Sequence, residues 1–147
     1  ENTEEPLDYD LIMRKAEEQR MKSTSSALSH ATVTTANNLG AKCIIAPTAS
    51  GATARVVSKF KPRTEIIGVT PNEEVMRRMQ IYWGVRPLKS IEFTTTEDVC
   101  SGAIDLVVAK QIVETGDVVV LTAGIPSPHF SGQKEGVSNI MRIAVIQ

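Results

Sequence analysis

The chain has 147 residues, 41% of them hydrophobic, which is enough for one domain with a core of its own. Sixteen Lys and Arg residues against seventeen Asp and Glu residues give a formal net charge of -1, so the basic surplus of a nucleic-acid-binding domain is absent. The longest apolar runs fall far short of the roughly 20 residues that a membrane-spanning helix needs. We therefore expect a single cytoplasmic domain, residues 1–147, with no nucleic-acid or membrane partner.

Two helices are predicted at the start of the chain, over residues 8–22 and 24–38, because apolar residues recur there at helical spacing. Gly40 is expected to end the second helix. Since the chain begins with Glu1 rather than Met, we interpret it as a piece of a longer protein.

Strands and helices alternate from residue 42 onward. The predicted strands cover residues 42–47, 65–70, 85–89, 117–122 and 139–146, and the predicted helices cover residues 52–60, 71–83 and 96–115. This alternation is typical of right-handed βαβ units with helices on both faces of the sheet. The last connection has no helix, so the last strand should be antiparallel at an edge. The prediction is an α/β three-layer sandwich with a five-stranded mixed sheet in the order 3-2-1-4-5.

Residues suited to catalysis or metal binding are few. Cys43 and Cys100 lie in apolar patterns without metal-ligand spacing, so we expect two buried thiols and no metal or other cofactor in this chain. Neither His30 nor His129 has a nearby nucleophile and acid, and no phosphate-loop, dinucleotide, zinc-protease or serine-hydrolase motif occurs. The sequence nominates no catalytic residue.

The helix starts that follow the strands differ in charge. Thr70 and Glu73 fit a capping box with proline at the first helical position, and the threonines at 94–96 precede Glu97 in the same manner. The turn at 47–54 has no acid in its first helical turn. Its unpaired N–H groups and the helix dipole favour an anion such as a phosphate.

The candidate phosphate site is therefore this turn. It comprises Thr48, Ala49, Ser50, Gly51, Ala52 and Thr53. The spacing leaves equally open the alternative that Ser50 simply caps the helix. The predicted strand order favours the phosphate, because the loops after the first and fourth strands would flank the crevice where open α/β sheets bind ligands. The long loop 123–138 adds Lys134 as a candidate ligand for a second anionic group.

Several stretches resemble the C-terminal domain of pyruvate kinase. They are the Ser29-His30 helix, the 47–54 turn, Ser58-Lys59-Phe60-Lys61-Pro62, Asn72-Glu73, Trp83-Gly84-Val85, Thr95-Thr96-Glu97, Thr122-Ala123-Gly124-Ile125-Pro126 and Asn139-Ile140-Met141-Arg142. The resemblance runs in the family's order from about residue 8 to the end. It implies a regulatory and subunit-association domain, in which residues 1–22 are a linker helix from a missing catalytic barrel. In that family phosphoenolpyruvate, ADP, magnesium and potassium bind outside this domain, so the chain alone should have no kinase activity.

The resemblance also implies an effector and a partner. The family's effector phosphate sits in the turn that matches residues 48–53, and its C-terminal domains pair across a two-fold axis close to the last strand. Members that bind fructose bisphosphate carry a Trp and an Arg near the helix matching 96–115, and neither residue type occurs here between Ser90 and Phe130. We therefore expect a monophosphate effector, either a sugar phosphate such as ribose 5-phosphate or glucose 6-phosphate, or a nucleoside monophosphate such as AMP.

Two other functions remain open. One is a stand-alone enzyme or binding module that acts on a small phosphorylated metabolite in the same crevice, for which His129 is the one candidate base. The other is a purely structural interface domain whose pocket is empty.

Overall fold

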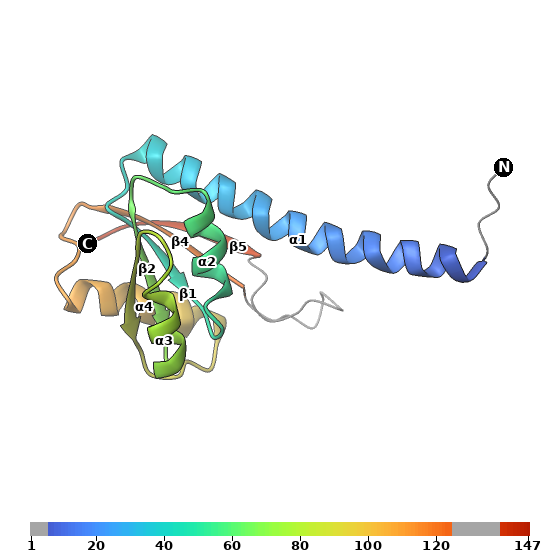
Figure 1. The fold of residues 1–147 in the computed structure, drawn as a ribbon. Helices are drawn as coiled ribbons and strands as arrows, with labels where there is room; N and C mark the ends of the chain where they lie inside the picture. Colours follow the sequence, from blue (N-terminus) through green and yellow to red (C-terminus); the bar gives the residue numbers. More distant parts are fainter. Residues whose placement is uncertain (1–5, 125–138) are drawn as a thin grey trace.

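The computed structural model describes residues 6–124 and 139–147 (Figure 1). Its elements are α1 (Pro6–Leu39), β1 (Cys43–Pro47), α2 (Ala52–Lys59), β2 (Glu65–Thr70), α3 (Glu73–Met79), β3 (Val85–Lys89), α4 (Thr96–Ala109), β4 (Val118–Ala123) and β5 (Ile140–Val145). No helix within these ranges combines the length and the apolar character that crossing a bilayer requires.

The five strands form one mixed sheet in the order β3-β2-β1-β4-β5. β1 pairs in parallel with both β2 and β4, β2 pairs in parallel with β3, and β5 is antiparallel to β4. The predicted order and strand directions are confirmed. Because β1 has β2 on one side and β4 on the other, the direction in which the sheet grows reverses between β1 and β4.

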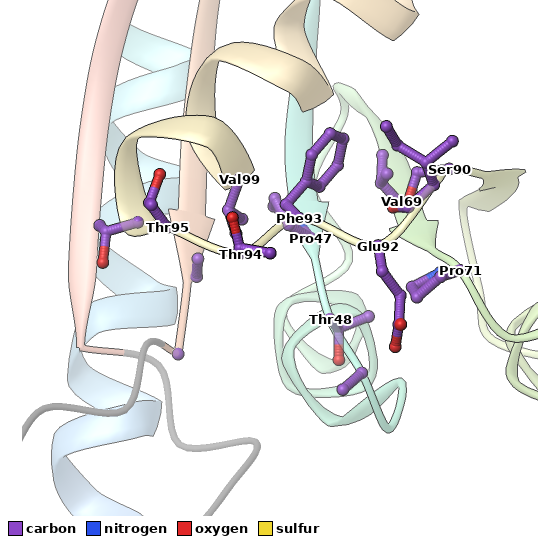
Figure 2. Close-up of a pocket in the computed structure, with 15 residues that line it drawn as sticks. Pro47, Thr48, Val69, Pro71, Ser90, Glu92, Phe93, Thr94, Thr95 and Val99 are labelled. Carbon is purple, nitrogen blue, oxygen red and sulfur yellow. The ribbon is translucent and has the colours of Figure 1, made fainter.

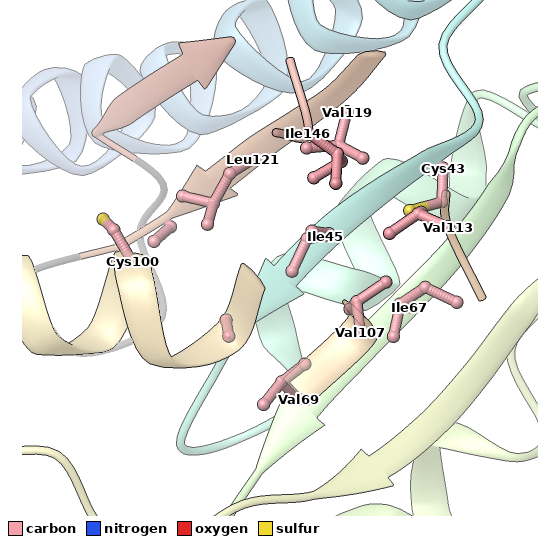
Figure 3. Packing of buried hydrophobic residues seen from close by; sticks show 12 residues of the cluster. Cys43, Ile45, Ile67, Val69, Cys100, Val107, Val113, Val119, Leu121 and Ile146 are labelled. Atoms are coloured by element: carbon pink, nitrogen blue, oxygen red, sulfur yellow. The ribbon is translucent and has the colours of Figure 1, made fainter. Parts of the chain in front are cut away.

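Two hydrophobic clusters lie on opposite faces of the sheet, because successive side chains of a strand point to opposite sides. Ile45 and Ile67 belong to the cluster under α4, which Figure 3 shows, and Ile44 and Ile66 belong to the cluster under α1, α2 and α3. The three predicted layers are confirmed. Burying one such side chain stabilises the fold by about 1.5–3 kcal/mol, and the sheet that these side chains stabilise holds the loops at its edge in place.

α1 is longer than predicted. The expected helices 8–22 and 24–38 are one continuous helix of 34 residues, because the junction contains serines and a threonine but no Gly or Pro. In Figure 1 its C-terminal part lies along the sheet and its N-terminal part projects beyond it. The packed part contacts α2, where His30 meets Phe60 with ring centroids 5.4 Å apart.

α3 begins later than predicted, and the capping box proposed for Thr70 is wrong. The N-cap is Asn72, whose side chain accepts hydrogen bonds from the N–H groups of Glu74 and Val75 at 2.8 and 3.2 Å. Thr70 Oγ1 instead accepts from the N–H of Asn72 at 3.3 Å, which leaves Pro71 outside the helix. The Asn72 side chain accepts from two N–H groups that have no partner within the helix, and the helix therefore begins after Asn72 rather than after Thr70.

α4 begins as expected and ends early. Thr95 is its N-cap, and Thr95 Oγ1 accepts from the N–H of Asp98 at 3.1 Å. The helix ends at Ala109 rather than near residue 115, since Gln111 has a left-handed φ of 59° that a right-handed helix does not allow. Both helix starts carry acids in their first turns, as predicted.

Candidate functional site

A cavity of about 450 Å³ opens at the carboxyl ends of the parallel strands (Figure 2). Residues 47–49, 69, 71, 90–96, 99 and 123–124 line it, which places the ends of β1, β2 and β4 and the β3–α4 connection around one space. Open α/β sheets bind ligands where the strand order reverses, and this volume lies in the range of small-molecule sites. We call it the switch-point cavity.

The predicted phosphate turn lies only partly on the wall of this cavity. Thr48 and Ala49 line it, whereas positions 50–53 do not. Ser50 is half-buried, and Thr53 is only 1% exposed, so its side chain belongs to the interior. Lys134 and His129 lie outside the described residues.

Hydrogen bonds fold the turn into a fixed shape. Thr48 Oγ1 accepts from the N–H of Gly51 at 2.8 Å, and Ser50 Oγ accepts from the N–H of Ala52 at 3.3 Å. Ser50 is not the N-cap residue, because Gly51 holds that position, but its hydroxyl still satisfies one N–H group of the first turn. Each hydroxyl that accepts in this way keeps its own O–H for donation to a ligand.

Gly51 is required at the start of α2 by its backbone. Its φ of 88° lies in the left-handed region that residues with a Cβ avoid. A Cβ at this position would also contact side-chain atoms of Met79 and Val75 at 3.4 Å. The turn therefore rests directly on α3, and its position is set by that packing.

The start of α2 carries no acid in its first turn, in contrast to the starts of α3 and α4. The N–H groups of Thr53 and Ala54 donate to no residue that the structure describes. The positive end of the α2 dipole is therefore compensated only by hydroxyl oxygens in this part of the chain.

Two lining residues were missed by the sequence analysis. Glu92 is the one ionisable residue among the described residues that line the switch-point cavity, and Phe93 contributes an aromatic wall. The ring of Phe93 lies against Gly102 so closely that a Cβ there would overlap it. The only signal in the sequence was an aromatic residue in a short connection between a strand and a helix.

The cysteines are buried, as predicted, and are not poised as nucleophiles. Burial, together with the charges of Glu65 and Asp117, raises the pKa of the Cys43 thiol from 9.0 to about 12. Burial also raises the pKa of Cys100. No group of three or more His, Cys, Asp or Glu side chains in the described ranges is arranged to hold a metal ion.

The order of the strands, the reversal beside β1 and the cavity at that point define a doubly wound α/β domain with a cavity at its switch point. The family model described as "Pyruvate kinase, alpha/beta domain" matches residues 26–144. The chain belongs to this family, and the resemblance seen in the sequence is confirmed.

The relatives that the chain matches are named pyruvate kinase. The chain is 34% identical over 147 residues to pyruvate kinase of Clostridium acetobutylicum, matching 100% of this chain and 30% of that protein. It is 34% identical over 144 residues to pyruvate kinase of Geobacillus stearothermophilus, matching 98% of this chain and 24% of the relative. It is also 34% identical over 145 residues to pyruvate kinase of Staphylococcus epidermidis, matching 99% of this chain and 24% of that protein. The chain thus spans between 24% and 30% of the length of these relatives.

Proposed function

We propose that this chain is the regulatory and subunit-association domain of a pyruvate kinase and that it binds a monophosphorylated effector at the 48–53 turn. The parent enzyme would transfer a phosphoryl group from phosphoenolpyruvate to ADP in a catalytic barrel outside this domain, joined to it through residues 1–22. The magnesium and potassium that the family resemblance implies belong to that proposed catalytic part.

The observation that carries the effector site is the shared position of the turn and the cavity. Thr48 and Ala49 lie on the wall of the switch-point cavity, and the acid-free start of α2 follows directly. A phosphate there would meet the positive end of the helix dipole, the N–H groups of the first turn and the O–H groups of Thr48 and Ser50. The remainder of a sugar phosphate or a nucleoside monophosphate would extend into the cavity.

Calorimetric titration with ribose 5-phosphate and AMP tests the effector site. Wild type is expected to bind at least one of them, and Ser50→Asp is expected to weaken binding by about tenfold or more, because a fixed carboxylate would stand beside the phosphate. Asn72→Asp is the matched control, since it adds the same charge at the N-cap of α3. Equal binding by wild type and Ser50→Asp would contradict the site.

The pure chain is expected not to convert phosphoenolpyruvate and ADP to pyruvate and ATP. The described residues that line the switch-point cavity include one carboxylate, that of Glu92, and no lysine or arginine, whereas phosphoryl transfer relies on metal ions and cations around the phosphate. A coupled assay with a full-length pyruvate kinase as positive control tests this. Measurable turnover by the pure chain would favour the stand-alone enzyme instead.

β5 supports the subunit-association role. Among the described strands it lies at one edge of the sheet, beside β4, and its Ile143 and Val145 are 51% and 54% exposed. An apolar edge of this kind aggregates unless it is covered, and a second copy related by a two-fold axis would cover it.

Sedimentation velocity tests the association. Wild type is expected to form dimers, and Ile143→Lys with Val145→Lys is expected to leave monomers, because two ammonium groups would face each other across the axis. Val108→Lys, at an exposed apolar position on α4, is the control and should still dimerise. A wild-type chain that stays monomeric at high concentration would count against the interface.

A further inference from the structure

Glu92 occupies a distinctive place in the switch-point cavity. It belongs to the connection between β3 and α4, its side chain is exposed, and no other lining residue among those described is ionisable. In Figure 2 its side chain extends toward the end of the cavity where Thr48 lies, and its carboxylate and the Thr48 hydroxyl point the same way. An acid therefore shares the cavity with the turn proposed to bind a phosphate.

No positive charge offsets this carboxylate within the described wall. None of the lining residues described is Lys or Arg. Gly102 has no room for a longer side chain, because the ring of Phe93 already covers it. Arg142 of β5 is held by Glu97, with Nη1 at 3.1 Å from Oε2, and does not line the cavity.

The two ends of a ligand would therefore meet opposite surroundings. One phosphate at the start of α2 gains from the helix dipole and from hydroxyl donors, whereas a second phosphate in the cavity would approach a carboxylate that no lysine or arginine of the described wall compensates. A hydroxyl or amino group in the same place would instead donate a hydrogen bond to that carboxylate.

We infer that Glu92 is a specificity-determining residue, which rejects ligands with a second phosphate and selects monophosphates that present a hydroxyl or amino group at the opposite end. This inference rests on the proposed effector site and names the ligand class that the site takes.

The test compares ribose 5-phosphate with fructose 1,6-bisphosphate by calorimetric titration of wild type, Glu92→Gln and Glu92→Lys. Wild type is expected to prefer the monophosphate, and Glu92→Gln is expected to improve the bisphosphate affinity by about tenfold relative to that of the monophosphate. Glu92→Lys should improve it further. Glu114→Gln is the matched control, since it removes the same charge before the amino end of β4, at the opposite edge of the sheet, and should leave the ratio unchanged.

Repeating the titrations at different salt concentrations distinguishes an effect of the Glu92 charge from a change in the shape of the cavity. The difference between wild type and Glu92→Gln should shrink when the salt concentration rises from about 50 mM to about 500 mM, because an exposed charge is screened. An affinity ratio that is the same in wild type and in both Glu92 variants would overturn the inference while leaving the effector site intact. A wild-type chain that binds neither ligand would overturn both.

Discussion

The ring of Phe93 lies directly against Gly102, and this contact joins the connection after β3 to the second turn of α4. Because the same connection forms one side of the switch-point cavity, the contact also fixes the position of that wall. A glycine in the interior of a helix costs about 1 kcal/mol relative to alanine, and here the close approach of the ring requires it.

Gly102→Ala is expected to destabilise the domain by about 1–3 kcal/mol, because the added methyl group overlaps the Phe93 ring. In a Phe93→Ala background the same change should instead stabilise it, since only the gain in helix propensity remains. Urea unfolding of the four proteins measures both effects. Destabilisation of equal size in the two backgrounds would show that the ring is not the cause.

Asn72→Ala should cost about 1–2 kcal/mol, because the Asn72 side chain accepts from two N–H groups at the start of α3. Thr95→Ala should cost less, since Thr95 accepts from one N–H group. Asn72→Asp keeps the acceptor and should stay close to wild type. Thermal unfolding of the three variants checks the ranking, and a larger loss for Thr95→Ala would contradict it.

The raised pKa of the Cys43 thiol predicts that the free energy of unfolding decreases at alkaline pH. The unfolded thiol ionises near pH 9.0 and the folded thiol near pH 12, so its contribution to stability is complete below pH 9.0 and is lost as the pH rises toward 12. The expected slope from this group is about 1.4 kcal/mol per pH unit.

Cys43→Ala provides the comparison for this slope. The variant should be less stable at neutral pH, because it leaves a small cavity in the core, but its stability should fall less steeply above pH 9.0. Urea unfolding from about pH 8 to about pH 10.5 measures both slopes. Parallel curves for the two proteins would refute the prediction.

Ser29→Ala is expected to stabilise the domain by about 1 kcal/mol. Ser29 is fully buried on α1, and its Oγ has no hydrogen-bond partner among the described residues. Replacing it removes an unsatisfied polar atom and adds a better helix former. Ser26→Ala, at an exposed position on the same helix, reports the propensity gain alone, and an equal gain at both positions would mean that Ser29 is satisfied.

The sheet could be predicted from the sequence because its signals are local and repeated. Apolar runs such as 65–70 alternate with helical patterns, and the lack of a helical pattern in the sequence before residue 139 predicted the antiparallel direction of β5, which is confirmed. The junction near Ser23 was misjudged, because weak helix formers do not end a helix that packing and length sustain. The cap of α3 was assigned to Thr70 because Thr70 and Glu73 fit a capping box, whereas the helix begins later and its N-cap is Asn72.

The candidate site was predicted only in part, for a different physical reason. The acid-free first turn of α2 is a property of consecutive residues and is visible in the sequence. The burial of Thr53 and the place of Glu92 on the cavity wall depend on how β1, β3 and α4 come together. Nothing in the spacing of residues 90–96 indicates which of them face the cavity.

α1 also has a mechanical consequence. At 34 residues it is about 51 Å long, and its packed end meets α2 through His30 and Phe60. Geometrically it is a lever arm, because the stretch from His30 back to Pro6 spans about 36 Å and a tilt of about 5° at His30 would displace the projecting end by about 3 Å. α2 begins at the 48–53 turn and ends beside that pivot, so a shift of α2 too small to disturb the core would be amplified at the far end of α1.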